Sequence, residues 1–179
     1  MKNRKAYPDD LTDQEWQFIG ILTENKKTKR GRKPKYGKRE MLDAIFYLLR
    51  TGCSWRHLPH DFPPWKTVYT QLRTWKQKDF FQKANHHLRG ELRKSLGRSK
   101  FPTAGIIDSQ SVKTTEKGGL KGYDGGKKVK GRKRHILVDT QGFLLAAHVT
   151  EANLNDREGL RRVLEKIENS YQKLKKNMG

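Results

Sequence analysis

The segment Ile106–Leu145, IIDSQSVKTTEKGGLKGYDGGKKVKGRKRHILVDTQGFLL, decides the fold of the second half of the chain. Apolar runs lie at both of its ends, and a stretch rich in glycine and lysine separates them. Short apolar runs bounded by turn residues are typical of buried strands. We therefore predict strands at 104–107, 135–138 and 143–149, with a hairpin turn at 139–142 between the last two.

A single helix is predicted after the third strand. Asn155 or Asp156 is well placed to cap its start, because a short polar side chain there accepts hydrogen bonds from the first turn. Apolar residues then recur at helical spacing and mark a buried face, namely Leu160, Val163, Leu164, Ile167, Tyr171 and Leu174. The region 103–179 is thus expected to contain three antiparallel strands and one helix.

The first hundred residues have a helical pattern instead. Thr12 and Glu15 form a capping-box signature at the start of one helix. A second helix is expected at about 39–50, with Gly52 well placed to end it. A third is expected after Pro64 and a fourth at about 80–96, with Trp65 and Trp75 in the core. The predicted fold class is therefore α+β, with a helical domain at 1–100 followed by a strand-containing domain.

The charge of the chain indicates a polyanionic partner. Its 179 residues carry 40 Lys and Arg against 19 Asp and Glu, a formal net charge of +21. A surface of this kind usually binds DNA, RNA or an anionic membrane. No apolar run approaches the roughly 20 residues that cross a bilayer, and the N-terminus does not resemble a signal peptide. With one cysteine, Cys53, a disulfide within the chain is excluded.

The third predicted helix presents a basic face that suits a helix-turn-helix module. In such a module this helix enters the major groove of DNA, with four side chains turned toward it: Lys66, Thr70, Arg73 and Lys76. The same pattern also fits an ordinary helical bundle whose solvated face is basic, and the pattern alone does not choose between them.

A basic linker at 26–38 offers a second candidate contact with DNA. Arg30, Gly31 and Arg32 resemble the arginine-glycine-arginine core of arms that lie in narrow, AT-rich minor grooves, although the match is imperfect because Lys33 stands between Arg32 and Pro34. The alternative is a tether that contacts phosphates without reading sequence.

The glycine-rich stretch in the opening segment is predicted to be a flexible basic loop beside a strand end, and it is the third candidate for a contact with DNA. Nine Lys and Arg lie between residues 113 and 134, and the ones expected to hold phosphates are Lys127, Lys128, Lys130, Arg132, Lys133 and Arg134. Asp108 follows the first predicted strand, so a bound phosphate backbone would pass near its carboxylate. The alternative for Asp108 is a turn residue that bonds its own backbone.

The combined motifs resemble the DDE transposases of bacterial insertion sequences. In the second half these are GIIDSQSVKT, GYDGGKKVKGRKRHILVDTQGFLL and VTEANLNDREG. In the first half they are LTDQEWQFIGIL, YGKREMLDAIFYLLRTGCSWRHLP and PPWKTVYTQLRTW. The resemblance covers nearly the whole chain and identifies Asp108 with the first catalytic aspartate of that family.

The resemblance implies a ribonuclease-H-like catalytic domain whose three acids hold two divalent cations, Mg²⁺ or Mn²⁺. A second aspartate would follow a fourth strand, and a glutamate would lie on a later helix. Neither is found after Leu174, so we expect the domain to be truncated. Asp156, at a helix start, is the weaker candidate for a second metal ligand, and Asp139 is weaker still.

The expected function is DNA transposition by metal-dependent phosphodiester cleavage and strand transfer, with double-stranded terminal repeats as the partner. Whether this chain is itself an enzyme is left open, since the second aspartate and the glutamate are missing and it is expected to be catalytically incomplete alone. A non-enzymatic DNA-binding regulator, the first product of a split reading frame, is the alternative. A second copy or a full-length transposase is a further expected partner, in the bacterial cytoplasm near the nucleoid.

Overall fold

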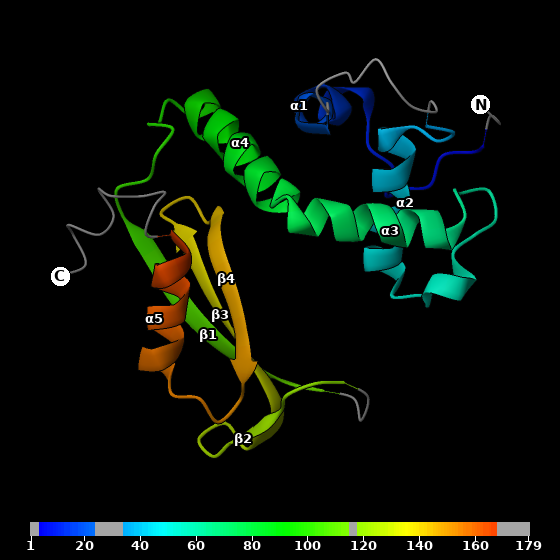
Figure 1. Ribbon diagram of the computed structural model, residues 1–179. Coiled ribbons are helices and arrows are strands. Elements are labelled where there is room, and N and C mark those ends of the chain that lie inside the picture. The colour runs from blue at the N-terminus through cyan, green and yellow to red at the C-terminus, as the bar shows by residue number, and fades with distance from the viewer. Residues whose placement is uncertain (1–3, 24–33, 115–117, 168–179) are drawn as a thin grey trace. The chain divides into compact units, whose positions relative to one another are not determined.

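The computed structural model describes residues 4–23, 34–114 and 118–167 (Figure 1). Their contacts divide the chain into two compact units, residues 1–88 and 89–179. The boundary falls within one helix, α4 (Phe80–Ser95). Each unit has its own core, and each is described by itself below.

The first unit is helical. It contains α1 (Asp13–Thr23), α2 (Lys38–Thr51), the 3-10 helix η1 (Trp55–His57), α3 (Trp65–Gln77) and the start of α4. The predicted capping box is confirmed: the Glu15 carboxylate accepts the Thr12 N–H at 2.8 Å, and the Thr12 hydroxyl accepts the Glu15 N–H at 3.2 Å. Gly52 ends α2 in the left-handed conformation, with φ of 66°.

Apolar side chains from every helix of this unit meet in one core. Its buried members are Leu11, Ile19, Met41, Leu42, Ala44, Ile45, Leu58, Phe62, Val68, Trp75 and Phe80. Trp75 stacks on Phe80 with ring centroids 4.8 Å apart, and Trp65 packs against the same core. The prediction that both tryptophans are core residues is confirmed.

The connection between α2 and α3 spans 52–64 and contains η1. The turn of a standard helix-turn-helix has only three or four residues. This helix pair therefore differs from that motif, and DNA reading by α3 stays a prediction.

The second unit is an antiparallel sheet covered by a helix on one face. β3 (Val129–Asp139) is central: β1 (Gly105–Lys113) pairs along one edge, and β4 (Leu144–Glu151) along the other. The short β2 (Gly122–Asp124) pairs with the start of β3, and α5 (Asp156–Ile167) follows β4. The α+β class and the three antiparallel strands with one helix are confirmed.

The strands extend further into the polar stretch than the apolar runs predict, and β2 was not predicted. The reason is that these parts of β1 and β3 are polar on both faces: the inward positions include Ser109, Ser111 and Lys133, which contact carboxylates, so no apolar run marks the strands there. The side chains of this stretch are therefore held on a sheet, and a large part of it is not a loop.

The core of the second unit lies between the sheet and α5. Leu137 and Val163 are fully buried there, with Ala146 and Ile167 beside them. The Asn155 side chain accepts the Glu158 N–H at 2.8 Å, which confirms Asn155 as the cap of α5. The predicted positions of Tyr171 and Leu174 on this helix lie outside the described residues.

One close packing fixes α5 on the sheet. A Cβ built on Gly159 would lie 2.0 Å from the His135 ring. His135, on β3, is 1% exposed, and its Nε2 lies 3.1 Å from the Thr150 hydroxyl. Burial lowers the pKa of His135. Only glycine lets the helix backbone approach the ring this closely.

A buried ion pair joins the end of α4 to the β3–β4 hairpin. Arg93 donates to the Asp139 carboxylate, and neither side chain is more than 7% exposed. Asp139 also accepts the N–H groups of Gln141 and Phe143, both at 2.9 Å. Burial alone raises the pKa of Asp139, but the Phe143 N–H and Arg93 outweigh it, and the pKa is lowered. This acid stabilises the turn.

No helix within the described residues is long and apolar enough to cross a membrane.

Candidate active site on the first strand

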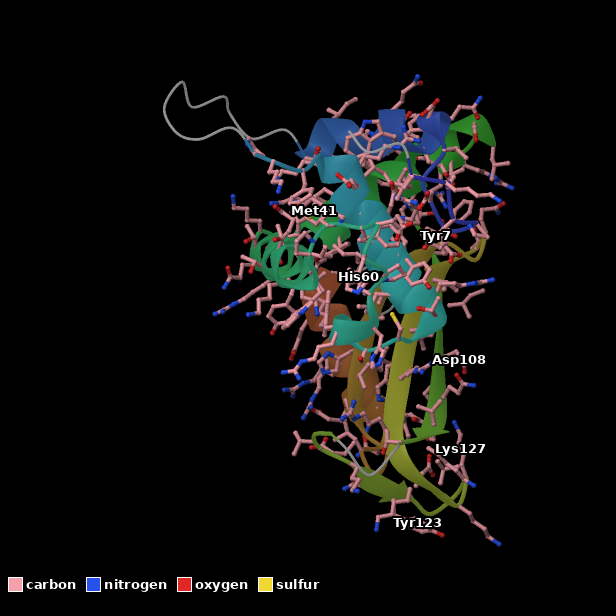
Figure 2. The ribbon with its side chains drawn as sticks, turned by 90° about the vertical axis from the view of Figure 1, so that its right-hand side faces the viewer. Tyr7, Met41, His60, Asp108, Tyr123 and Lys127 are labelled. Carbon is pink, nitrogen blue, oxygen red and sulfur yellow. The ribbon has the colours of Figure 1, made fainter. Side chains whose placement is uncertain are left out.

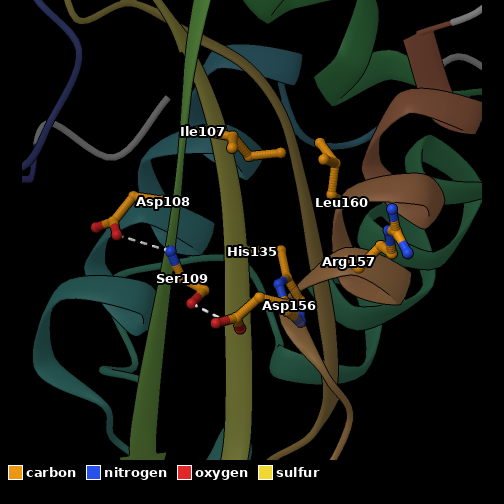
Figure 3. A pocket seen from close by; sticks show the side chains of 7 residues that line it. All are labelled: Ile107, Asp108, Ser109, His135, Asp156, Arg157 and Leu160. Carbon is orange, nitrogen blue, oxygen red and sulfur yellow. Dashed lines mark hydrogen bonds between the residues drawn. The ribbon is translucent and has the colours of Figure 1, made fainter.

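Asp108 lies in the middle of β1, exposed to solvent, and directly opposite Ile136 of β3. Side chains alternate along a strand, so Ile107 and Ser109 face α5 while Asp108 projects from the opposite face of the sheet. Figure 3 shows this division, with Asp108 on one side of the strand and Ser109 on the other. One carboxylate oxygen of Asp108 accepts the Ser109 N–H at 2.8 Å. Its other oxygen points outward from the strand (Figure 3).

A hollow of about 460 Å³ lies beside this strand (Figure 3). It is lined by Ile107, Asp108, Ser109, His135, Asp156, Arg157 and Leu160. The lining residues come from β1, β3 and the first two turns of α5. The start of α5 is therefore held close to the strand that carries Asp108.

Ser109 connects the strand to α5. Its hydroxyl donates to the Asp156 carboxylate at 2.9 Å, and the same carboxylate oxygen lies 3.1 Å from the Lys133 ammonium. The Ser109 hydrogen bond, followed by the one from Lys133, lowers the pKa of Asp156. Asp156 is thus an ionised group engaged on the α5 side of the sheet.

Ser111 makes the corresponding contact on the other side of Lys133. Its hydroxyl donates to the Asp124 carboxylate, which also accepts the Gly126 and Lys127 N–H groups at 3.1 and 3.0 Å. These bonds, that of Ser111 first, lower the pKa of Asp124 to about 2. The Lys133 ammonium lies 3.6 Å from Asp124.

Lys133 is the centre of this polar network. Only 6% of the residue is exposed, and its ammonium donates to the Leu154 carbonyl at 2.9 Å in addition to facing Asp124 and Asp156. One buried cation therefore links β1, β2, β3 and the loop before α5. The Lys133 side chain lies in the interior. Its predicted contact with a phosphate stays a prediction.

The other predicted phosphate-binding residues of the second unit lie nearer the surface. Lys127, Lys128, Lys130 and Arg134 are exposed. The Lys127 ammonium donates to the Ser109 carbonyl at 2.9 Å, one residue from Asp108. Arg132 is half-buried and donates to the carbonyls of Gly118 and Leu120.

The predicted DNA-binding residues of the first unit are divided. Lys66, Thr70, Arg73 and Lys76 are all exposed on α3, on the side opposite Val68 and Trp75. Arg30, Arg32 and Lys33 of the linker lie outside the described residues.

Two parts of the chain match known protein families. Residues 11–85 match the family described as "Putative transposase of IS4/5 family", and residues 99–176 match the "Transposase DDE domain". The chain belongs to the insertion-sequence DDE transposases. The second match contains Asp108 and the whole network around Lys133.

One curated relative of this transposase is "Uncharacterized protein y4sN" of Sinorhizobium fredii (strain NBRC 101917 / NGR234). It is 34% identical over 68 residues, which cover 37% of this chain and 53% of that protein. The matched part of the chain therefore spans about half the length of this relative. No solved structure matches the chain.

DDE transposase domains generally use a divalent metal. In the described part of this transposase, two exposed carboxylates line the hollow, those of Asp108 and Asp156. Within residues 4–23, 34–114 and 118–167, no group of three or more His, Cys, Asp or Glu side chains could hold a metal ion. Asp156, the weaker candidate ligand, is bonded to Ser109 and Lys133 on the other side of the strand. The described residues alone do not fit a resident cation, and we derive no reaction step through one.

Sequence reasoning missed three polar residues of this transposase site: Ser109, Ser111 and Asp124. The two serines are two residues apart on the strand, and Asp108 precedes the first of them by one. This spacing is the signal that could have placed the serines together on the face of the sheet opposite Asp108. Asp124 stands among lysines and glycines, where its contacts with Ser111 and Lys133 leave no sequence signal.

Proposed function

We propose that this transposase binds the DNA ends of its insertion sequence, and that Asp108 contributes one carboxylate to the metal centre that cleaves and joins phosphodiesters. The observation that carries the proposal is the exposure of Asp108 on the face of the sheet that also bears Arg134. Arg134 is paired with Gln110. Asp108 is therefore the diagonal neighbour of Arg134, at a separation of roughly 7–8 Å. A phosphate held by Arg134 would therefore lie close to the Asp108 carboxylate.

The charge supports DNA as the partner. Exposed cations follow β3 and the turn before it, and the chain as a whole carries a formal charge of +21. Each phosphate that such a surface neutralises releases condensed counterions from DNA. Binding is therefore expected to weaken steeply as salt rises.

In the first unit, α3 is the element we propose for recognition of the terminal repeats. Its exposed face carries Lys66, Arg73 and Lys76, while its other face is anchored in the core by Val68 and Trp75. A helix held in this way presents its polar side chains in a fixed orientation, which reading of base edges requires.

We further propose that the chain on its own binds DNA without cleaving it. The support is that Asp156, the other carboxylate that lines the hollow, is already engaged by Lys133 and Ser109, which leaves Asp108 for a cation. Mg²⁺ bound to one carboxylate keeps most of its water ligands and is held weakly. Carboxylates from elsewhere would have to complete the centre.

The test is to measure binding and nicking with the same purified chain. Duplex carrying the terminal repeat should bind with a steep salt dependence, and no Mg²⁺-dependent nicking should be seen. Asp108→Ala and the matched exposed variant Gln110→Ala should both keep the affinity within about twofold. Robust nicking that is lost in Asp108→Ala and kept in Gln110→Ala would overturn the proposed incompleteness. Failure to bind any DNA would overturn the proposed function.

A second candidate function is a regulator that occupies the terminal repeats without cutting them. A related observation favours it: the described residues present exposed cations to DNA, and they contain no group of three or more His, Cys, Asp or Glu side chains that could hold a metal ion. Footprinting on the terminal repeats, together with transposition measured with and without this chain, distinguishes the two. A footprint accompanied by reduced transposition supports regulation, and unchanged transposition contradicts it.

A further inference from the structure

A second hollow, of about 430 Å³, lies at the end of the sheet formed by β2. It is lined by Lys113, Thr114, Lys121, Tyr123, Lys128 and Lys130. Four of its six lining residues are lysines, and none is acidic. The nearest acid of β2, Asp124, is 9% exposed and is bonded to Ser111 instead. The hollow therefore suits an anionic ligand.

Tyr123 gives this hollow an apolar surface as well. The residue is 57% exposed. Aromatic side chains contribute most to stability and binding when they are buried, so this ring is available to a ligand. Its strand partner is Lys130, so the ring and an ammonium group project from the same face of the sheet. An exposed ring among cations is the combination that proteins use to bind single-stranded nucleic acids.

We propose that this hollow binds an unpaired DNA strand, with a base stacked on Tyr123 and the phosphates held by Lys121, Lys128 and Lys130. The proposal rests on the proposed function, since it concerns the same DNA partner. It adds a site, and a form of DNA, that neither the family matches nor the catalytic acid assigns.

The tyrosine favours an unpaired strand over a duplex. In a duplex each base is covered on both faces by its neighbours, so the exposed ring would gain little there beyond contact with the sugar and phosphate. An unpaired base presents a free face to the ring, and stacking of this kind tolerates any base. Duplex DNA would engage the lysines alone.

The position of the hollow relative to Asp108 gives the strand a direction. Tyr123, Lys130, Arg134 and Asp108 all project from the face of the sheet opposite α5. Figure 2 shows Asp108, Lys127 and Tyr123 following one another toward the β2 end of the sheet. Lys130 and Arg134 are four residues apart on one strand, or about 13 Å. A strand bound in the hollow would therefore pass Arg134 on its way to Asp108.

The experiment compares a fluorescent oligothymidine with a hairpin duplex of equal phosphate number, using anisotropy titrations of the full chain. Tyr123→Leu should weaken oligothymidine binding by about tenfold, and duplex binding by less than twofold. Tyr123→Phe keeps the ring and should restore the affinity. Lys121→Ala should reduce the slope of log K against log salt for oligothymidine by about 0.7. Arg161→Ala, which removes an exposed charge from α5, should not change the preference between the two DNAs.

The outcomes separate this inference from the function on which it rests. If the wild-type chain binds neither DNA, the proposed function fails. If it binds duplex while Tyr123→Leu leaves oligothymidine affinity unchanged, the inference alone is wrong. A loss for Tyr123→Leu that is equal on both DNAs also overturns it, because the ring then makes no distinction between paired and unpaired bases. Circular dichroism of each variant confirms that the sheet is intact.

Discussion

Arg93→Met should destabilise the second unit by about 3 kcal/mol. Removing one partner of a buried ion pair costs about 3–5 kcal/mol, since the other charge stays buried. Here Asp139 is fully buried, and it keeps the N–H groups of Gln141 and Phe143. Those two bonds place the expected loss at the lower end of that range.

The positions of the tryptophans make the measurement specific. All four, at positions 16, 55, 65 and 75, lie in the first unit. Urea unfolding followed by tryptophan fluorescence reports that unit, whereas far-ultraviolet circular dichroism reports both. The Arg93→Met transition should move to lower urea in circular dichroism alone. Lys94→Met is the matched control, because Lys94 pairs with Glu91 at the surface, and its loss should cost less than about 1 kcal/mol.

The deficit should also depend on pH. The pKa of Asp139 is lowered in the folded wild type, so its contribution is present above the unfolded value of about 3.9 and is lost as pH falls below it. Without Arg93 the pKa of the buried Asp139 carboxylate should rise, because one of the groups that stabilise its ionised form is gone. The difference between wild type and variant should therefore be largest above about pH 5 and should narrow toward pH 3. If Arg93→Met proved no more harmful than Lys94→Met at pH 7, the buried pair would not stabilise the hairpin as described.

Three further variants test other contacts. Gly159→Ala should destabilise the second unit by about 1–3 kcal/mol, because its Cβ would overlap the His135 ring; adding His135→Ala should recover part of the loss in circular dichroism melts, and full stability of Gly159→Ala would contradict this packing. Lys133→Met removes a charged donor from the half-buried Leu154 carbonyl and should cost about 1.5–3 kcal/mol in urea unfolding; an unchanged midpoint would show that the network does not depend on this lysine. Thr12→Ala breaks the capping box with Glu15 and should lower the stability of the first unit by about 1 kcal/mol; tryptophan fluorescence checks it, and a shift seen only in the second unit would refute the assignment.

Much of the fold follows from the sequence because its signals are local. The Thr12 capping box, the glycine that ends α2 and the Asn155 cap of α5 each depend on atoms within a few residues. The apolar runs at 135–138 and 143–149 predict the central hairpin because both strands are buried against one helix. These elements were placed without any knowledge of long-range contacts.

The extent of the sheet could not be predicted in the same way. β2 has only three residues, and no apolar run marks it, since Tyr123 is its exposed member. It forms because β3 extends beyond its pairing with β4, and residues 129–131 of β3 pair there with Gly122–Asp124. This pairing depends on tertiary structure, which local propensity does not encode.

The site shows the same limit. The family resemblance singles out Asp108, and the structure places it, exposed, on the first strand; its catalytic role stays a prediction. Lys133 stands in the run KGRKRH, where all the cations look equivalent. Only the period-two alternation of β3 sends Lys133 toward the buried face and Arg134 toward solvent. Reading this run as a strand would have separated them, and reading it as a flexible loop did not.

Among the described strands, β1 hydrogen-bonds to β3 and leaves its outer side open to whatever polypeptide can lie alongside. A strand that paired there would hydrogen-bond to the backbone amides and carbonyls of β1 and would place its own side chains next to Asp108. Pairing of the strand and the arrival of further carboxylates beside Asp108 would then occur together. Under the proposed function, pairing at this edge would couple completion of the metal centre to assembly with a further strand.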